Sequence, residues 1–434
     1  MDNVQAILML VIILGGMVLM MLDVFPMVVC LPVMGIALAA VAGIPLIATE
    51  GESISQTVIQ AGATNLADSY ASCFFAAWIG VVMATTKVTE TMVKKGAELG
   101  GDKTLVVAII LYLITSLLFT TLRGLGSVIM LGSIVLPILM AVGVDKRHAV
   151  TIFEFGYITG NTYNLSVMNT YAVIAGLPLT EVAKFEMILA ILCLLAALSY
   201  ICFHYFYKGK KFAFSAPVEV KKADDTGYQI KGVRGALAMM TPLVPVVLVI
   251  GFKLSLIASF LVALVWIVIW TFQGGWKKTI DMVIKSAYDG LVDAQFSIVQ
   301  MIVLGILTAA VATTGVKEAF APIAQYLVPS SPLLLILLFG IGAPLGLYRG
   351  LWNLWGIGAG IMALMISIGG DPYVLIAGFC STTMMTLICC PTQAGVIWSS
   401  GYCGIEVMDH VKRCIKFLWP AAIIGTIIGA IMYF

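Results

Sequence analysis

The sequence predicts an all-α polytopic membrane protein built as an inverted-topology repeat of two five-span halves. Hydrophobic residues make up 61% of the 434 residues and charged residues only 11%, which is too apolar for a soluble globular domain. Two apolar stretches each carry one central arginine, Arg123 and Arg349, 226 residues apart. Leu-Arg-Gly-Leu around Arg123 matches Tyr-Arg-Gly-Leu around Arg349. We therefore interpret the chain as two copies of one unit.

The first half, residues 1–207, begins with apolar segments at 6–22 and 25–48 that are long enough to be spans. Residues 49–68 hold acidic but no basic side chains, so we expect an outer loop, and residues 69–85 return inward. The amphipathic segment 86–103 carries four lysines. By the positive-inside rule it is predicted to lie on the cytoplasmic surface.

Residues 103–143 must begin and end on the same side, because residues 145–148 are also basic. Each part of this stretch is near or below the ~20 residues that a span needs, which predicts a re-entrant hairpin with its tip at 120–127. Polar residues interrupt the next segment, 148–176, and predict a broken helix. Irregular backbone at that depth is tolerated only where it lines protein or a water cavity. A span at 182–207 completes the half.

The very basic residues 208–235 are predicted to form a cytoplasmic linker to the second half, residues 236–434. Spans are expected at 236–252, 254–272 and 294–313, with a basic inner loop before the third. A hairpin at 331–369, a broken helix at 372–400, an inner segment at 408–416 and a last span at 417–434 complete the order. Because each half has an odd number of spans, five, the second half has the opposite orientation in the membrane. This gives about ten spans and places both termini outside.

Inverted repeats, hairpins and interrupted helices near mid-membrane are typical of secondary transporters. Half-helix N-termini attract anions, and two arginines add bidentate donors that suit a carboxylate. We therefore predict transport of a small organic acid anion coupled to Na⁺ or H⁺, with neither the anion nor the ion specified by the residues. No combination of acid, base and nucleophile indicates an enzyme, and no cofactor is expected beyond a bound Na⁺.

Residues at the hairpin tips and helix breaks form the predicted substrate site: Arg123, Gly124, Arg349, Gly350, Asn353, Asn164, Asn169, Thr392 and Gln393. Residues near the same places are predicted to couple the ion: Ser127, Asn161, Thr162, Thr170, Thr386 and Glu154. The arginines could instead tie the tips to backbone carbonyls, and the polar residues could satisfy freed backbone groups. Glu154 is either a proton carrier or a member of a structural pair.

Residues 132–149, GSIVLPILMAVGVDKRHA, follow the predicted hairpin tip and precede the predicted broken helix. They resemble the ion transporter superfamily, which includes gluconate permeases, C4-dicarboxylate carriers, citrate carriers and the large membrane subunit of tripartite ATP-independent periplasmic transporters. The resemblance implies a scaffold domain, a transport domain that moves as an elevator, and a homodimer in the bacterial cytoplasmic membrane. The open alternatives are a tripartite subunit that needs a binding-protein partner and a cation/proton antiporter of the same fold.

Overall fold

The computed structural model describes residues 3–22, 24–101, 103–207, 232–324 and 328–434, and this part of the chain contains helices but no strand. The predicted all-α class is confirmed. Most of the predicted linker, residues 208–231, lies outside the described residues, and residues 232–235 begin a helix.

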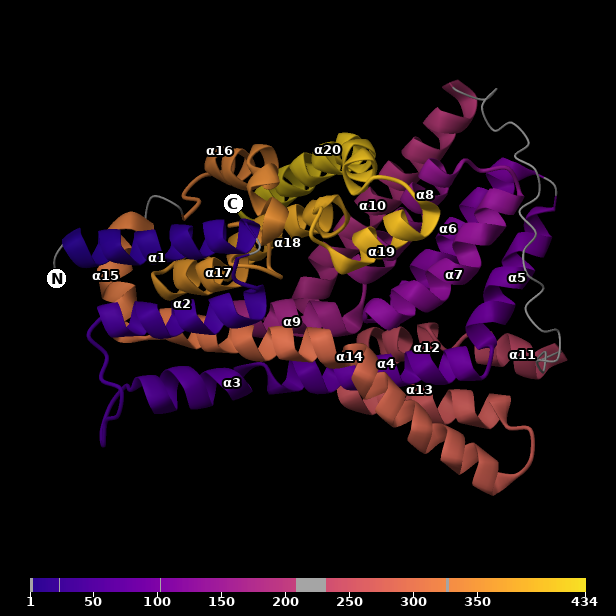
Figure 1. Cartoon of the computed structure of the whole chain (residues 1–434), viewed down its shortest axis with the longest axis horizontal. Helices are drawn as coiled ribbons and strands as arrows, with labels where there is room; N and C mark the ends of the chain where they lie inside the picture. Colours follow the sequence, from indigo (N-terminus) through magenta and orange to yellow (C-terminus); the bar gives the residue numbers. More distant parts are fainter. Residues whose placement is uncertain (1–2, 23, 102, 208–231, 325–327) are drawn as a thin grey trace.

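The first half contains long helices, short helices and helices interrupted by breaks (Figure 1). They are α1 (Asn3–Met21), α2 (Met27–Val41), η1 (Ile54–Gln60), α3 (Ala61–Asn65), α4 (Ala67–Thr85), α5 (Val88–Gly100), α6 (Thr104–Phe119), α7 (Leu125–Ala141), α8 (Lys146–Thr162), α9 (Leu165–Ala175) and α10 (Leu179–Tyr207). Helices α6 and α7 lie within the predicted hairpin, and α8 and α9 match the predicted broken helix, with α8 beginning two residues earlier at Lys146.

The second half follows a similar order of elements. They are α11 (Gly232–Met239), α12 (Leu243–Val246), η2 (Val247–Gly251), α13 (Leu256–Thr271), α14 (Trp276–Ala312), α15 (Thr314–Ala324), α16 (Pro332–Leu335), η3 (Ile336–Ile341), η4 (Ala343–Arg349), α17 (Gly358–Ser367), α18 (Pro372–Cys389), α19 (Ala394–Cys403) and α20 (Val407–Tyr433).

Two segments expected to be loops are helical, and so is the expected inner segment 408–416. The expected outer loop 49–68 is helical from Ile54 onward and joins α4 in one helix, Ile54–Thr85. The expected basic loop before residue 294 forms the first turns of α14, and residues 408–416 begin α20. Charge alone does not end a helix, because charged side chains can project into water from its exposed face. Lys277, Lys278 and Lys285 are all exposed in this way.

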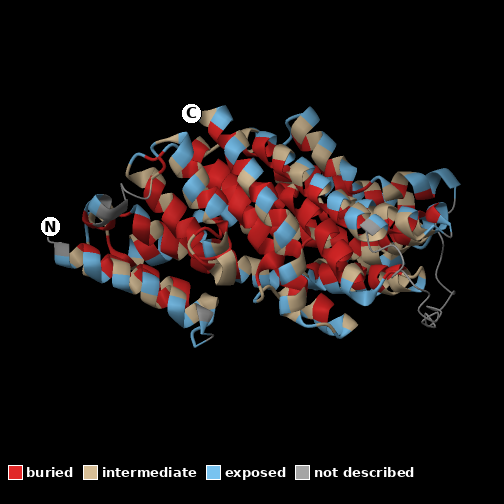
Figure 2. Ribbon diagram, turned by 90° about the horizontal axis from the view of Figure 1, so that it is seen from above, coloured by how far each residue is buried: buried red, intermediate tan, exposed pale blue. Residues whose placement is uncertain are grey.

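Within the described residues, five helices are long and apolar enough to cross a membrane, or up to seven if each of two bent helix pairs is one span. The other apolar helices have 10–17 residues, so fewer full-length spans are found than the ten expected. Large apolar side chains remain exposed on the outer helices, while buried residues gather along the middle of the molecule (Figure 2). Such an apolar exterior is what an integral membrane protein presents to lipid.

The long helix α14 runs beside α2, α3 and α4 (Figure 1). Glycines allow the closest approach: a Cβ atom on Gly305 would lie 2.3 Å from the carbonyl oxygen of Gly62. Small residues are the usual means of close helix packing in lipid. A second group of helices packs around α8, α18 and α20, with α6 and α10 beside them. The segment formed by α18 and α19 is surrounded by protein rather than lipid, because 94% of its most apolar 18-residue stretch is buried.

We expect Gly305→Ala to lower the melting temperature of the purified protein in detergent. The new methyl group would collide with the backbone of Gly62, which can move only if its helix moves. The expected loss is about 1–3 kcal/mol, as for other overpacked sites. Gly15→Ala on α1 is the matched control, because a Cβ atom there meets nothing within 4 Å. Equal melting temperatures for the two variants would contradict this packing.

Candidate substrate site

The tip between α6 and α7 closes tightly against α14. Gly124 has a φ of 90°, a conformation that residues with a side chain rarely adopt. A Cβ atom at this position would also lie 2.5 Å from the backbone oxygen of Asp293 on α14. Glycine therefore gives the tip both its turn and its close approach. Arg123, directly before it, is buried, with 7% of its surface exposed.

Asn164 joins the break between α8 and α9 to this tip. Its side-chain oxygen accepts hydrogen bonds from the backbone N–H groups of Ser166 and Val167, which caps α9. Its Nδ2 donates to the carbonyl oxygens of Phe119 at 2.9 Å and Leu122 at 3.1 Å. Since both ends of this buried amide bind protein, Asn164 supports the tip and has no free group to offer a ligand.

The second tip lies between η4 and α17 and is irregular. Tyr348 and Arg349 both have positive φ values, 54° and 62°. Non-glycine residues in this conformation store strain, which tends to occur at functional sites. Asn353 supports the tip: its Oδ1 accepts from the backbone N–H of Trp355 at 2.8 Å, and its Nδ2 donates to the carbonyl oxygen of Gly346 at 3.3 Å.

Trp355 links the two arginines. The guanidinium of Arg123 lies over the Trp355 ring, 4.9 Å from its centroid, and its Nη1 donates to Ser166 Oγ at 3.2 Å. Arg349 donates from Nη1 to the Trp355 carbonyl oxygen at 3.2 Å and from Nη2 to Gln393 Oε1 at 2.8 Å. In the described part of the chain, neither arginine forms an ion pair with a carboxylate. Their contacts in this part of the chain are neutral acceptors and an aromatic ring, which leave the positive charges uncompensated.

Both arginines line one cavity of about 80 Å³ between the tips, α8, α14 and the start of α19. Its wall consists of Arg123, Gly124, Leu125, Val128, Tyr157, Asn161, Phe296, Ser297, Gln300, Arg349, Trp355, Leu387, Gln393, Ala394 and Gly395. Among the residues that the structure describes, no aspartate or glutamate belongs to this wall. The first residues of α7 and α19 are included, and helix N-termini favour negative charge. The cavity is thus suited to an anion.

Five of the predicted site residues line this cavity: Arg123, Gly124, Asn161, Arg349 and Gln393. The other substrate-site candidates lie elsewhere. Gly350 and Asn353 are buried within the second tip, Thr392 is exposed, and the Asn169 Nδ2 lies 3.5 Å from Ser69 Oγ on α4.

The predicted ion-coupling residues, Asn161 apart, lie outside the cavity wall. Thr162, Thr170 and Thr386 each donate a hydroxyl hydrogen bond to a carbonyl oxygen in their own helix. Ser127 donates to Asp293 Oδ2 at 3.0 Å. Glu154 is fully buried, and its Oε1 accepts from Ser399 Oγ at 2.7 Å.

Residues that the sequence analysis did not select complete the wall. Tyr157 contributes from α8, and Ser297 and Gln300 contribute from α14. Gln300 donates from Nε2 to the Trp355 carbonyl oxygen at 2.8 Å, so this oxygen receives both Gln300 and Arg349. The available signal was a glutamine within the apolar run 298–312. That signal does not indicate which face of the helix points toward the arginines.

Comparisons with known proteins agree with a carrier. No curated protein sequence matches the chain. The structure is similar to that of the YdaH transporter of Alcanivorax borkumensis, with a TM-score of 0.60 at 13% identity over 94% of this chain and 98% of that one, a likeness that shows the fold alone. The model of the C4-dicarboxylate anaerobic carrier family (DcuC) matches residues 98–434. The chain therefore belongs to the C4-dicarboxylate anaerobic carrier family and is an integral membrane carrier rather than an enzyme.

Proposed function

We propose that the protein carries C4-dicarboxylates across the membrane and holds a substrate carboxylate between Arg123 and Arg349. The observation that carries this proposal is the pair of arginines that line one cavity without a carboxylate partner. A charged group in a low-dielectric interior is costly unless it is paired. A substrate carboxylate supplies the missing charge and accepts the parallel N–H donors of a guanidinium.

We propose that the two carboxylates of the substrate use different parts of the cavity. One binds the arginines, and the other meets the N-terminal ends of α7 and α19, whose first residues belong to the wall. Tyr157, Asn161 and Gln393 add neutral donors between these positions. A monocarboxylate of equal length would bind either the arginines or the helix N-termini but not both, which supports selection for dicarboxylates.

We propose an inverted repeat and an elevator motion. Support comes from the order of elements: each half contains a long helix (Ile54–Thr85 or α14), then a hairpin, then an interrupted helix, then a long last helix (α10 or α20). The two long helices pack together with α1, α2 and α13, and would form the scaffold of a homodimer. The hairpins and interrupted helices hold the cavity and would move as the transport domain.

We propose H⁺ as the coupling ion, with Glu154 as its carrier. Glu154 is fully buried, and its Oε2 has no hydrogen-bond partner among the described residues, which leaves a position for a proton. Intramembrane carboxyl groups of this kind commonly relay protons. Glu154 also lies one helical turn from Tyr157 in the cavity wall and one turn from Thr151 on the other side.

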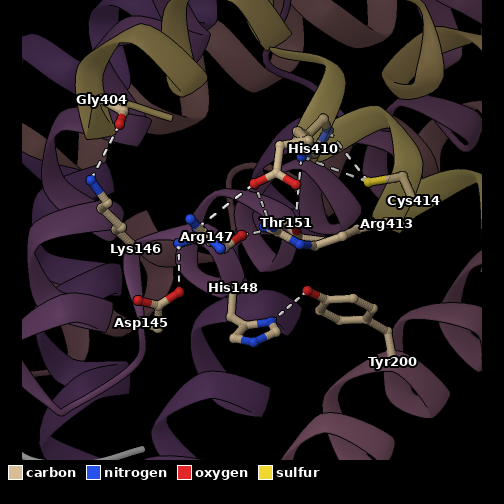
Figure 3. Close-up of polar contacts among 11 residues, drawn as sticks. Asp145, Lys146, Arg147, His148, Thr151, Tyr200, Gly404, His410, Arg413 and Cys414 are labelled. Atoms are coloured by element: carbon tan, nitrogen blue, oxygen red, sulfur yellow. Dashed lines mark hydrogen bonds and ion pairs between the residues drawn. The ribbon is translucent and has the colours of Figure 1, made fainter. Parts of the chain in front are cut away.

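Thr151 belongs to a cluster of polar and charged side chains at the starts of α8 and α20 (Figure 3). Its hydroxyl lies 3.5 Å from His410 Nδ1, and Cys414 lies beside the same imidazole. Asp409 forms ion pairs with Arg413 and Arg147 at the exposed end. Polar groups therefore extend from the surface to Thr151, one helical turn from Glu154, which supports a route for protons.

Replacing either arginine is expected to remove substrate binding while the protein stays folded. For Arg123→Gln and Arg349→Gln we expect the affinity for succinate to fall by roughly 100-fold, since loss of one partner of a buried charged contact costs about 2–5 kcal/mol. The measurement is the ligand-induced rise in melting temperature. Arg234→Gln, an exposed arginine on α11, is the control. Wild-type affinity in both cavity variants would refute the site.

Glu154→Gln is expected to abolish accumulation of succinate driven by a pH gradient in proteoliposomes, because the amide cannot carry a proton. Exchange of internal for external succinate, which needs no net proton movement, should continue. Glu98→Gln, at an exposed position on α5, is the control and should behave as wild type. Accumulation driven by a Na⁺ gradient in the wild-type protein, or by a pH gradient in Glu154→Gln, would argue against this assignment.

A further inference from the structure

A carboxylate of the protein already occupies the first hairpin tip. The hydroxyl of Ser127, the third residue of α7, lies 3.0 Å from Oδ2 of Asp293 on α14 and 2.9 Å from the Arg123 carbonyl oxygen, so these two acceptors share its one hydrogen. The Asp293 Oδ1 is buried against the tip, and a Cβ atom on Gly126 would lie 2.0 Å from it. The backbone N–H groups of Gly126 and Ser127 face the Asp293 carboxylate, which forms no ion pair within the described residues. The position that a helix N-terminus offers to an anion is thus filled by Asp293.

This position borders the substrate cavity. Phe296, Ser297 and Gln300 follow Asp293 by three, four and seven residues, so the same face of α14 lines the cavity. Gly124 and Leu125 belong to the cavity wall and to the tip that Asp293 contacts. An anion in the cavity therefore approaches the same end of α7.

We propose that Asp293 is an internal competitor of the substrate: its carboxylate occupies the N-terminal end of α7 until a substrate carboxylate displaces it. The inference rests on the proposed dicarboxylate function. Displacement removes the Ser127 to Asp293 hydrogen bond and so releases the tip from α14. A role for Asp293 in holding Na⁺ is disfavoured, because the N-terminal end of a helix carries partial positive charge.

The contact is also asymmetric. Asp68 precedes Asp293 by 225 residues, one fewer than the 226 residues that separate the two arginines, and lies on the long helix of the first half. Its side chain is exposed, whereas Asp293 is in contact with a hairpin tip. Only one of these two acids therefore contacts a tip in this conformation, as expected for a contact that changes during the transport cycle.

Asp293→Asn tests the inference, because it keeps the shape of the side chain and removes its charge. We expect succinate to bind about ten-fold tighter than to the wild type, the effect of losing one charge-assisted hydrogen bond that competes with the ligand. The melting temperature without ligand should fall, because the tip loses its contact with α14. Affinity is measured by isothermal titration calorimetry on the purified full chain. Asp289→Asn, one turn earlier on α14 and exposed, is the control and should match the wild type.

Asp293→Ser provides a second neutral variant if the asparagine variant does not fold. Affinity for succinate equal to or weaker than that of the wild type in a folded Asp293 variant overturns the inference and leaves the arginine site intact. A wild-type protein that binds no C4-dicarboxylate overturns the proposed function and this inference with it. Tighter binding in the Asp293 variants, with Asp289→Asn unchanged, supports competition.

Discussion

The unpaired charge of Arg123 and Arg349 is the constraint on which the rest of the site depends. The protein offers these guanidinium groups Ser166, Gln393, one carbonyl oxygen and the ring of Trp355, all of which are neutral. Neutral acceptors orient a guanidinium but leave its charge uncompensated. The site therefore keeps a defined position for an anion, with donors held in place before the anion arrives.

Side chains around the arginines form hydrogen bonds with backbone groups that an uninterrupted helix would have paired internally. Each interruption leaves N–H and C=O groups without partners at a depth where lipid offers none. Asn164 and Asn353 bond such groups at the first break and the second tip. Both ends of each amide bind protein, so these residues position the arginines and the cavity wall. Asp293 adds a contact between the first tip and α14.

The sequence was sufficient to predict the all-helical membrane fold and the places where helices are interrupted. Glycine and polar residues within apolar runs mark the tip at 120–127 and the break near Asn164, and helices end at both places. Charge bias was less informative about helix ends, because Lys277 and Lys285 lie on an exposed face of α14. Local patterns of charge thus do not mark the end of a helix.

The inward-facing residues of the site were only partly predictable. Asn161 and Asn164 are three residues apart in one polar segment, yet Asn161 lines the cavity and Asn164 lies behind it. That difference arises where α8 ends and the chain turns, at Tyr163. Gln300 binds the carbonyl oxygen of Trp355 at the second tip, and Asp293 contacts the first tip from the other half of the chain. A single sequence does not reveal such contacts.

The most direct test of the account is calorimetric binding of three four-carbon ligands to the purified single chain. They are succinate, its monocarboxylate analogue butyrate, and the neutral diamide succinamide. The account predicts measurable binding of succinate, much weaker binding of butyrate and none of succinamide, because the arginines and helix N-termini require negative charge on both ends of the ligand. Equal binding of succinate and succinamide, or no binding of succinate, would contradict a dicarboxylate site at Arg123 and Arg349.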